Sequence, residues 1–123
     1  MERDRAVAEQ ALCLSTSALV RGRLAAYAAT WGDRGLAAGL RALPCPSDRT
    51  RLPVYLTHAI CLVACVQGAH QLQDALGSLY IAAMFLCYAK EQDFEEHLDH
   101  AAAIVAAIER WLASVECEVP RVT

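Results

Sequence analysis

Hydrophobic positions recur every three or four residues along most of the chain, which is the spacing of one face of an α-helix. Prolines, glycines and short polar segments interrupt this pattern. The apolar runs are longer than typical strands and are not enriched in β-branched residues, so the pattern does not favour a sheet. It predicts five helices, over residues 4–29, 33–43, 53–70, 73–90 and 91–116. We therefore expect one compact all-α bundle formed by residues 1–123.

The first predicted helix carries two apolar stripes. The first stripe consists of Val7, Ala11, Leu14, Ala18 and Ala25. The second consists of Cys13, Val20, Leu24, Tyr27 and Trp31. A helix with two apolar stripes contacts two neighbours, or one neighbour and a partner chain. The polar sequence Arg21-Gly22-Arg23 interrupts both stripes and predicts a kink.

The second predicted helix is short. Asp33 is a suitable N-cap, and Pro44 ends the helix. Gly35 and Gly39 each cost about 1 kcal/mol relative to alanine, so this helix depends on packing. Its apolar side consists of Leu36, Leu40 and Leu43.

The third and fourth predicted helices, 53–70 and 73–90, are apolar nearly all round. Such helices belong at the centre of a bundle, so we expect them to form a central antiparallel hairpin. Both also carry small residues at helical spacing, which let helix axes approach closely. These residues are Thr57, Cys61, Ala64 and Gly68 on the third helix and Ala75, Ser78, Ala82 and Ala89 on the fourth.

The fifth predicted helix, 91–116, has the clearest single apolar face. This face consists of Phe94, Leu98, Ala101, Val105, Ile108, Leu112 and Val115. Acidic residues crowd its first turns, which suits the positive end of the helix dipole. A solvated acidic turn is the favoured interpretation of EQDFEEHLDH, with a divalent cation or a basic partner surface as alternatives.

Charge is distributed unevenly along the chain. Residues 1–60 contain eight arginines and five acids, a net charge of +3, and residues 61–123 contain three basic residues and nine acids, a net charge of −6. The two halves can therefore attract each other. The total of −3 gives no general electrostatic footprint for nucleic acid, so no nucleic-acid partner is expected.

The expected setting is intracellular. The first ten residues lack the apolar segment of a signal peptide, and most cysteines lie inside apolar helical patterns. Buried free thiols in a reducing, cytoplasmic compartment are therefore predicted. The apolar runs 53–66 and 75–89 are too short to span a bilayer, so no membrane association is expected.

The stretch HAICLVACVQGAH, residues 58–70, looks like a metal or haem site. On a helix, His58, Cys61 and Cys65 fall within about 60° of arc, and Cys87 on the next helix is a candidate fourth ligand. His70 lies about 120° away from His58. The spacing matches no standard zinc pattern, so the favoured interpretation is a wall of the core, with no metal or cofactor.

A second group of candidates is a basic patch for a partner. The residues expected to contact the partner are Arg21, Arg23, Tyr27, Trp31 and Arg34, with Arg41, Arg49 and Arg51 nearby. Scattered surface arginines are the alternative. Sequence motifs for a nucleophile elbow or a phosphate-binding loop are absent, so catalysis is not expected.

These patterns predict a small non-enzymatic protein-interaction module that acts through an apolar helix face. Two helices that are apolar all round need more cover than the other three provide, so we expect a homodimer or a helical partner that covers part of the first or fourth helix. A viral host-interaction factor and a bacterial regulatory or immunity protein both fit. The alternative is a helical bundle that binds a small apolar ligand, metal or haem.

Overall fold

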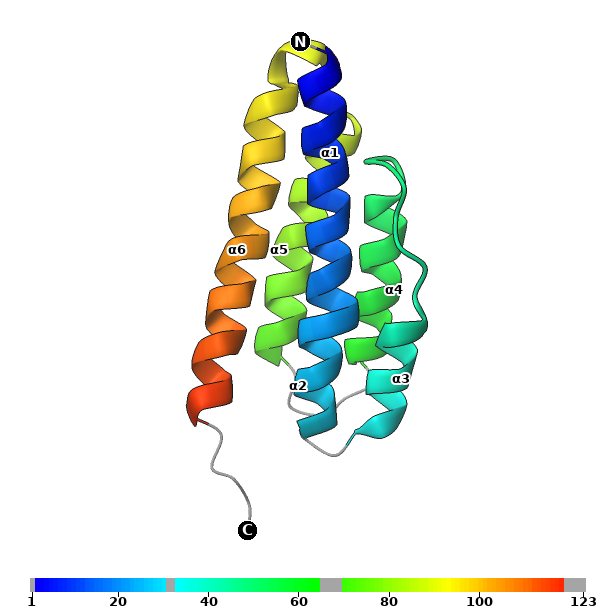
Figure 1. Ribbon diagram of the computed structural model, residues 1–123, viewed down its shortest axis with the longest axis vertical. Coiled ribbons are helices and arrows are strands. Elements are labelled where there is room, and N and C mark those ends of the chain that lie inside the picture. The colour runs from blue at the N-terminus through cyan, green and yellow to red at the C-terminus, as the bar shows by residue number, and fades with distance from the viewer. Residues whose placement is uncertain (1, 31–32, 65–69, 119–123) are drawn as a thin grey trace.

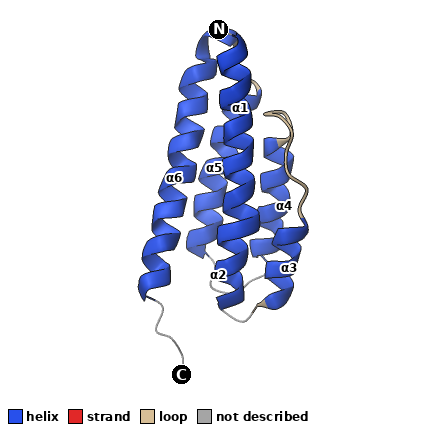
Figure 2. Cartoon of the chain, in the orientation of Figure 1, coloured by secondary structure: helices blue, strands red, loops and turns tan. Residues whose placement is uncertain are grey.

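The computed structural model describes residues 2–30, 33–64 and 70–118, and these residues form helices and the turns between them, without a strand (Figures 1 and 2). The all-α prediction is confirmed. In chain order, the elements are α1 (Glu2–Ser17), η1 (Ala18–Leu24), α2 (Ala25–Thr30), α3 (Arg34–Ala42), α4 (Leu52–Ala64), α5 (His70–Cys87), η2 (Glu91–Asp93) and α6 (Phe94–Glu118).

The helices lie roughly along one direction and form a bundle (Figure 1). α1, η1 and α2 follow one another without a break, α6 packs along α1, and α5 packs against both α4 and α6. α3 packs against η1, α2 and α4. Leucines dominate the interior, and each such side chain contributes about 1.5–3 kcal/mol when it is fully buried. The leucines that are at least 98% buried are Leu19, Leu24, Leu40, Leu52, Leu56, Leu76, Leu79, Leu86 and Leu112.

At the position of the predicted kink, the first helix contains a π-helical segment, η1. Its wider turn exposes Arg21, Gly22 and Arg23 in succession, while Leu24 and Ala25 return to the core. The extra residue in the turn shifts the helical phase. For this reason Ala25 is buried. An uninterrupted α-helix would have placed it on the exposed stripe with Val7, Ala11, Leu14 and Ala18.

The short helix α3 has the predicted cap. The Asp33 carboxylate accepts a hydrogen bond from the Leu36 backbone N–H at 2.9 Å, which satisfies one of the open donors of the first turn. Gly39 allows close packing against α4, because a Cβ at this position would lie 3.3 Å from a Leu62 methyl carbon. Packing on Leu62 therefore accounts for a glycine that weakens the isolated helix.

The hairpin of α4 and α5 differs from its prediction in two respects. α4 is not buried all round, because Val54, His58 and Cys61 lie on an exposed side. The small residues of α4 are exposed, namely Thr57, Cys61 and Ala64. On α5, Ala75 and Ser78 line a surface hollow whose other wall comes from α6. Gly68 lies outside the described residues. Close packing of α4 on α5 therefore does not use the two small-residue stripes.

α6 buries the face that the sequence predicts, from Phe94 to Leu112. Val115 is not among the residues whose side chains are described. At the start of α6, the Arg5 guanidinium forms an ion pair with Glu91 at 3.4 Å and donates a hydrogen bond to the Glu91 carbonyl at 3.0 Å. A contact between the basic and the acidic half of the chain therefore fixes the beginning of α1 beside the beginning of α6.

Candidate functional site: an apolar face on α5

Three large apolar side chains project into solvent from one side of α5 and of the turn that directly follows it. Ile81, Phe85 and Tyr88 are 58%, 60% and 77% exposed. They are four and three residues apart, so consecutive turns of the helix place them on the same side. The opposite side of α5, which includes Leu79, Ala82 and Leu86, lies in the core. We call the three exposed residues the α5 face.

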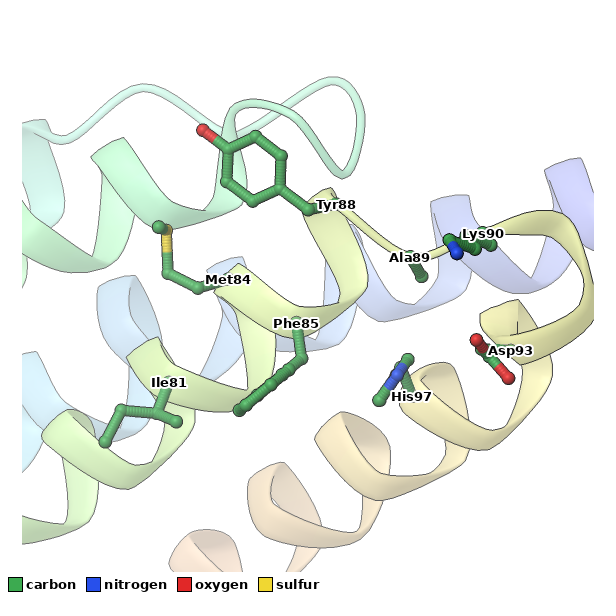
Figure 3. Close-up of a pocket in the computed structure, with 8 residues that line it drawn as sticks. All are labelled: Ile81, Met84, Phe85, Tyr88, Ala89, Lys90, Asp93 and His97. Carbon is green, nitrogen blue, oxygen red and sulfur yellow. The ribbon is translucent and has the colours of Figure 1, made fainter.

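A pocket of about 440 Å³ lies at this face, between the end of α5 and the beginning of α6 (Figure 3). The imidazole ring of His97 stacks on the ring of Phe85, with 5.6 Å between centroids and 15° between planes. Lys90 and Asp93 place a positive and a negative group at the rim. The remaining lining residues are Ile81, Met84, Tyr88 and Ala89.

The apolar surface continues along the boundary between α5 and α6. A second hollow of about 250 Å³ is lined by Ala75, Ser78, Ile104, Ala107, Ile108 and Trp111. The Trp111 ring is held in place by the buried Tyr27 ring, whose centroid is 6.3 Å away. Two hollows with largely apolar linings therefore lie along the boundary between α5 and α6.

The chemistry of the α5 face is suited to protein recognition. Tyrosine is enriched in binding hot spots, and phenylalanine, tyrosine and methionine are enriched in protein–protein interfaces. Isolated exposed apolar residues are ordinary, but a group on one helix face is typical of an interaction site. Lys90 and Asp93 add charged groups at the edge of this apolar surface.

A further hollow of about 450 Å³ lies between α4 and the loop that precedes it. Cys45, Val54, Tyr55 and His58 are among its lining residues. Burial raises the pKa of the Tyr55 phenol, an effect that the nearby Ser17 hydroxyl opposes. The phenol therefore stays protonated at neutral pH, and its oxygen is buried and not exposed to the hollow.

The metal candidates do not come together in the structure. His58 and Cys61 are exposed on the outer side of α4, Cys87 is partly buried on α5, and Cys65 lies outside the described residues. No group of three or more His, Cys, Asp or Glu side chains close enough to bind a metal occurs within 2–30, 33–64 and 70–118.

The prediction that this stretch forms a wall of the core is wrong for His58 and Cys61. The core side of α4 instead includes Leu56, Ala59 and Val63. Because α4 is apolar on both sides, its sequence could not show which side is buried.

The predicted partner-binding residues are divided between surface and core. Arg21, Arg23 and Arg34 are exposed, and Arg21 Nε donates a hydrogen bond to the Arg41 carbonyl at 3.2 Å, which links η1 to α3. Tyr27 is 5% exposed and packs on Trp111, so the expectation that it contacts a partner is not met. Trp31 lies outside the described residues.

Sequence reasoning missed Ile81, Phe85 and His97 as site residues. The available signal was that 73–90 has more apolar positions than one buried face can use.

Within the described part of the chain, none of the helices has the length and apolar character needed to cross a bilayer. Comparison of the chain with protein-family models, with curated proteins and with solved structures gave no match.

Proposed function

We propose that this protein is a non-enzymatic interaction module that binds a protein partner through the α5 face, in a reducing intracellular compartment. The observation that carries the proposal is the set of three large apolar side chains, Ile81, Phe85 and Tyr88, all more than half exposed on one helix side. Leaving such side chains in water is unfavourable, since burying each one contributes about 1.5–3 kcal/mol.

The surroundings of the α5 face support binding to a protein. Phe85 is stacked on His97, so its ring is already ordered before a partner arrives. An ordered aromatic side chain loses little conformational entropy on binding. The hollows along α5 and α6 offer additional apolar contact area, and Lys90 and Asp93 supply polar contacts at one end.

Photo-cross-linking tests this proposal. A benzophenone amino acid is placed at Phe85 in the full chain, and at Ala102 in a matched control, because Ala102 is exposed elsewhere on α6. The expected result, in cells that naturally make the protein, is one discrete cross-linked protein from position 85 and none from position 102. Adding Ile81→Asp should abolish that product, since a charge on the α5 face opposes apolar contact.

Two outcomes would contradict the proposal. One is the same set of products from positions 85 and 102, which would indicate collisional labelling. The other is a product from position 85 that persists with Ile81→Asp, while circular dichroism shows the variant to be folded. Either result would show that the α5 face does not bind a specific protein partner.

A further inference from the structure

A second exposed apolar stripe runs along α1, which lies on the near side of the molecule in Figure 1. Val7 and Leu14 are 66% and 55% exposed, and Ala11 and Ala18 are also exposed. These four positions follow each other at spacings of four, three and four residues, so they share one helix side. The opposite side of α1 is buried and includes Leu12, Cys13 and Thr16.

The stripe ends in η1, to which Ala18 belongs. Gly22 is exposed there, and a Cβ added to it would meet no atom within 4 Å. Glycine in the middle of a helix costs about 1 kcal/mol relative to alanine. Packing within the chain therefore does not require glycine at this position.

Large and small residues alternate along the stripe, because Val7 and Leu14 are large and Ala11 and Ala18 are small. A second copy of the stripe that runs in the opposite direction can place its small residues opposite the large ones. Two α1 helices can pack antiparallel around a two-fold axis that crosses the exposed stripe at the level of residues 12 and 13. Val7 then faces Ala18 of the second copy. Ala11 then faces Leu14 of the second copy, and symmetry repeats both pairs. Each large side chain therefore meets an alanine, which allows close packing.

Charge favours the same direction. Asp4 near one end of the stripe and Arg21 near the other end carry opposite charges, and both residues are exposed. Antiparallel packing in this register places Asp4 beside Arg21 of the second copy at both ends of the contact. Parallel packing would place the two Arg21 side chains together, which is unfavourable.

We propose that the exposed stripe of α1 binds a second copy of this chain, antiparallel, and forms a closed two-fold dimer. This contact is separate from the α5 face, since Figure 3 shows the pocket with α1 behind it. A dimer of this kind carries two α5 faces, both free. A partner with two binding segments would then be held by avidity in addition to its affinity for each face.

The size alternation provides a direct test by sedimentation velocity on the full chain. The wild type should sediment as a species of about 27 kDa, twice the 13.4 kDa of one chain. Ala11→Leu brings two leucines together, and Leu14→Ala removes apolar contact, so each should weaken dimerisation about tenfold. Ala11→Leu/Leu14→Ala exchanges the two sizes across the axis and should restore the dissociation constant to nearly the wild-type value.

Leu14→Glu should give a monomer, whereas Phe85→Glu, a matched change at a similarly exposed position, should leave the dimer intact. Circular dichroism checks that each variant folds. A wild-type monomer at 500 μM overturns the dimer, and a double variant no better than Ala11→Leu overturns the antiparallel pairing. A dimer that is lost with Phe85→Glu and kept with Leu14→Glu would assign self-association to the α5 face and overturn the α1 dimer. Failure of the cross-linking experiment would instead overturn partner binding at the α5 face and leave the α1 dimer unaffected.

Discussion

Cys13 shows how the core acts on a single residue. Its side chain is 1% exposed, so the prediction of buried thiols is met at this position. It is not met at Cys61, which is exposed, and Cys87 is only half-buried. Burial, assisted by the negative charge of Glu9, raises the pKa of the Cys13 thiol from 9.0 to about 11. The neutral thiol is therefore the form that the folded state accommodates, and ionisation opposes folding.

Stability should fall in alkaline solution because of this thiol. Because the pKa of the Cys13 thiol is higher in the folded state, the neutral thiol contributes to the free energy of unfolding. This contribution is fully present below pH 9 and is lost as pH rises from 9 to 11, by about 1.4 kcal/mol per pH unit at most. Urea unfolding at pH 8, 9 and 10 measures the change.

Cys13→Ala provides the control, because the alanine variant lacks this ionisation and retains the alkaline titration of Tyr55. Its free energy of unfolding should change less between pH 9 and 10 than that of the wild type. Equal slopes for the two proteins would show that Cys13 ionises as readily in the folded state as in the unfolded state.

Helix phase explains where sequence reasoning failed at the scale of elements. Helices with one apolar face, such as α6, have their buried side defined by the sequence alone. α4 and α5 have apolar residues on both sides, and both orientations bury similar side chains. The neighbouring helices decided which side faces the core, so the α5 face became visible only in the structure.

Glycines inside helices provide a test of the same packing. Gly77 lies in the middle of α5, and a Cβ there would meet nothing within 4 Å. Gly77→Ala should therefore raise the free energy of unfolding by about 1 kcal/mol through helix propensity alone.

Gly39→Ala in α3 is the matched comparison. Its new Cβ would lie 3.3 Å from Leu62, so the leucine must move and the gain should be smaller or reversed. Chemical denaturation of both variants measures the difference. Equal stabilisation by the two changes would mean that α3 does not pack on α4 in solution as it does in the structure.

At the scale of the whole molecule, Phe94 joins three segments that are distant in the sequence. The guanidinium groups of Arg5 and Arg49 lie 5.5 Å and 4.9 Å from the centroid of its ring. Arg49 also forms an ion pair with Glu9 at 3.7 Å. The beginning of α1, the loop before α4 and the beginning of α6 therefore meet at one aromatic ring.

A double-mutant cycle measures this junction. Phe94→Leu and Arg49→Met each retain an apolar side chain and remove one partner of the cation–π contact. The coupling free energy between them should be about 0.5–1 kcal/mol, because the site is partly exposed. A coupling near zero, with both single variants folded, would show that the arginine covers the ring without electrostatic attraction.

The sequence by itself determined the helical class, the approximate helix limits, the Asp33 cap and the buried face of 91–116. These features depend on local propensity and on a single apolar periodicity, which are properties of short segments. The tertiary structure decided which side of α4 and α5 is buried, how η1 shifts Ala25 into the core, and that Tyr27 packs inside on Trp111. It also decided the candidate site, because Phe85 and His97 come from two helices, and their stacking depends on how those helices pack.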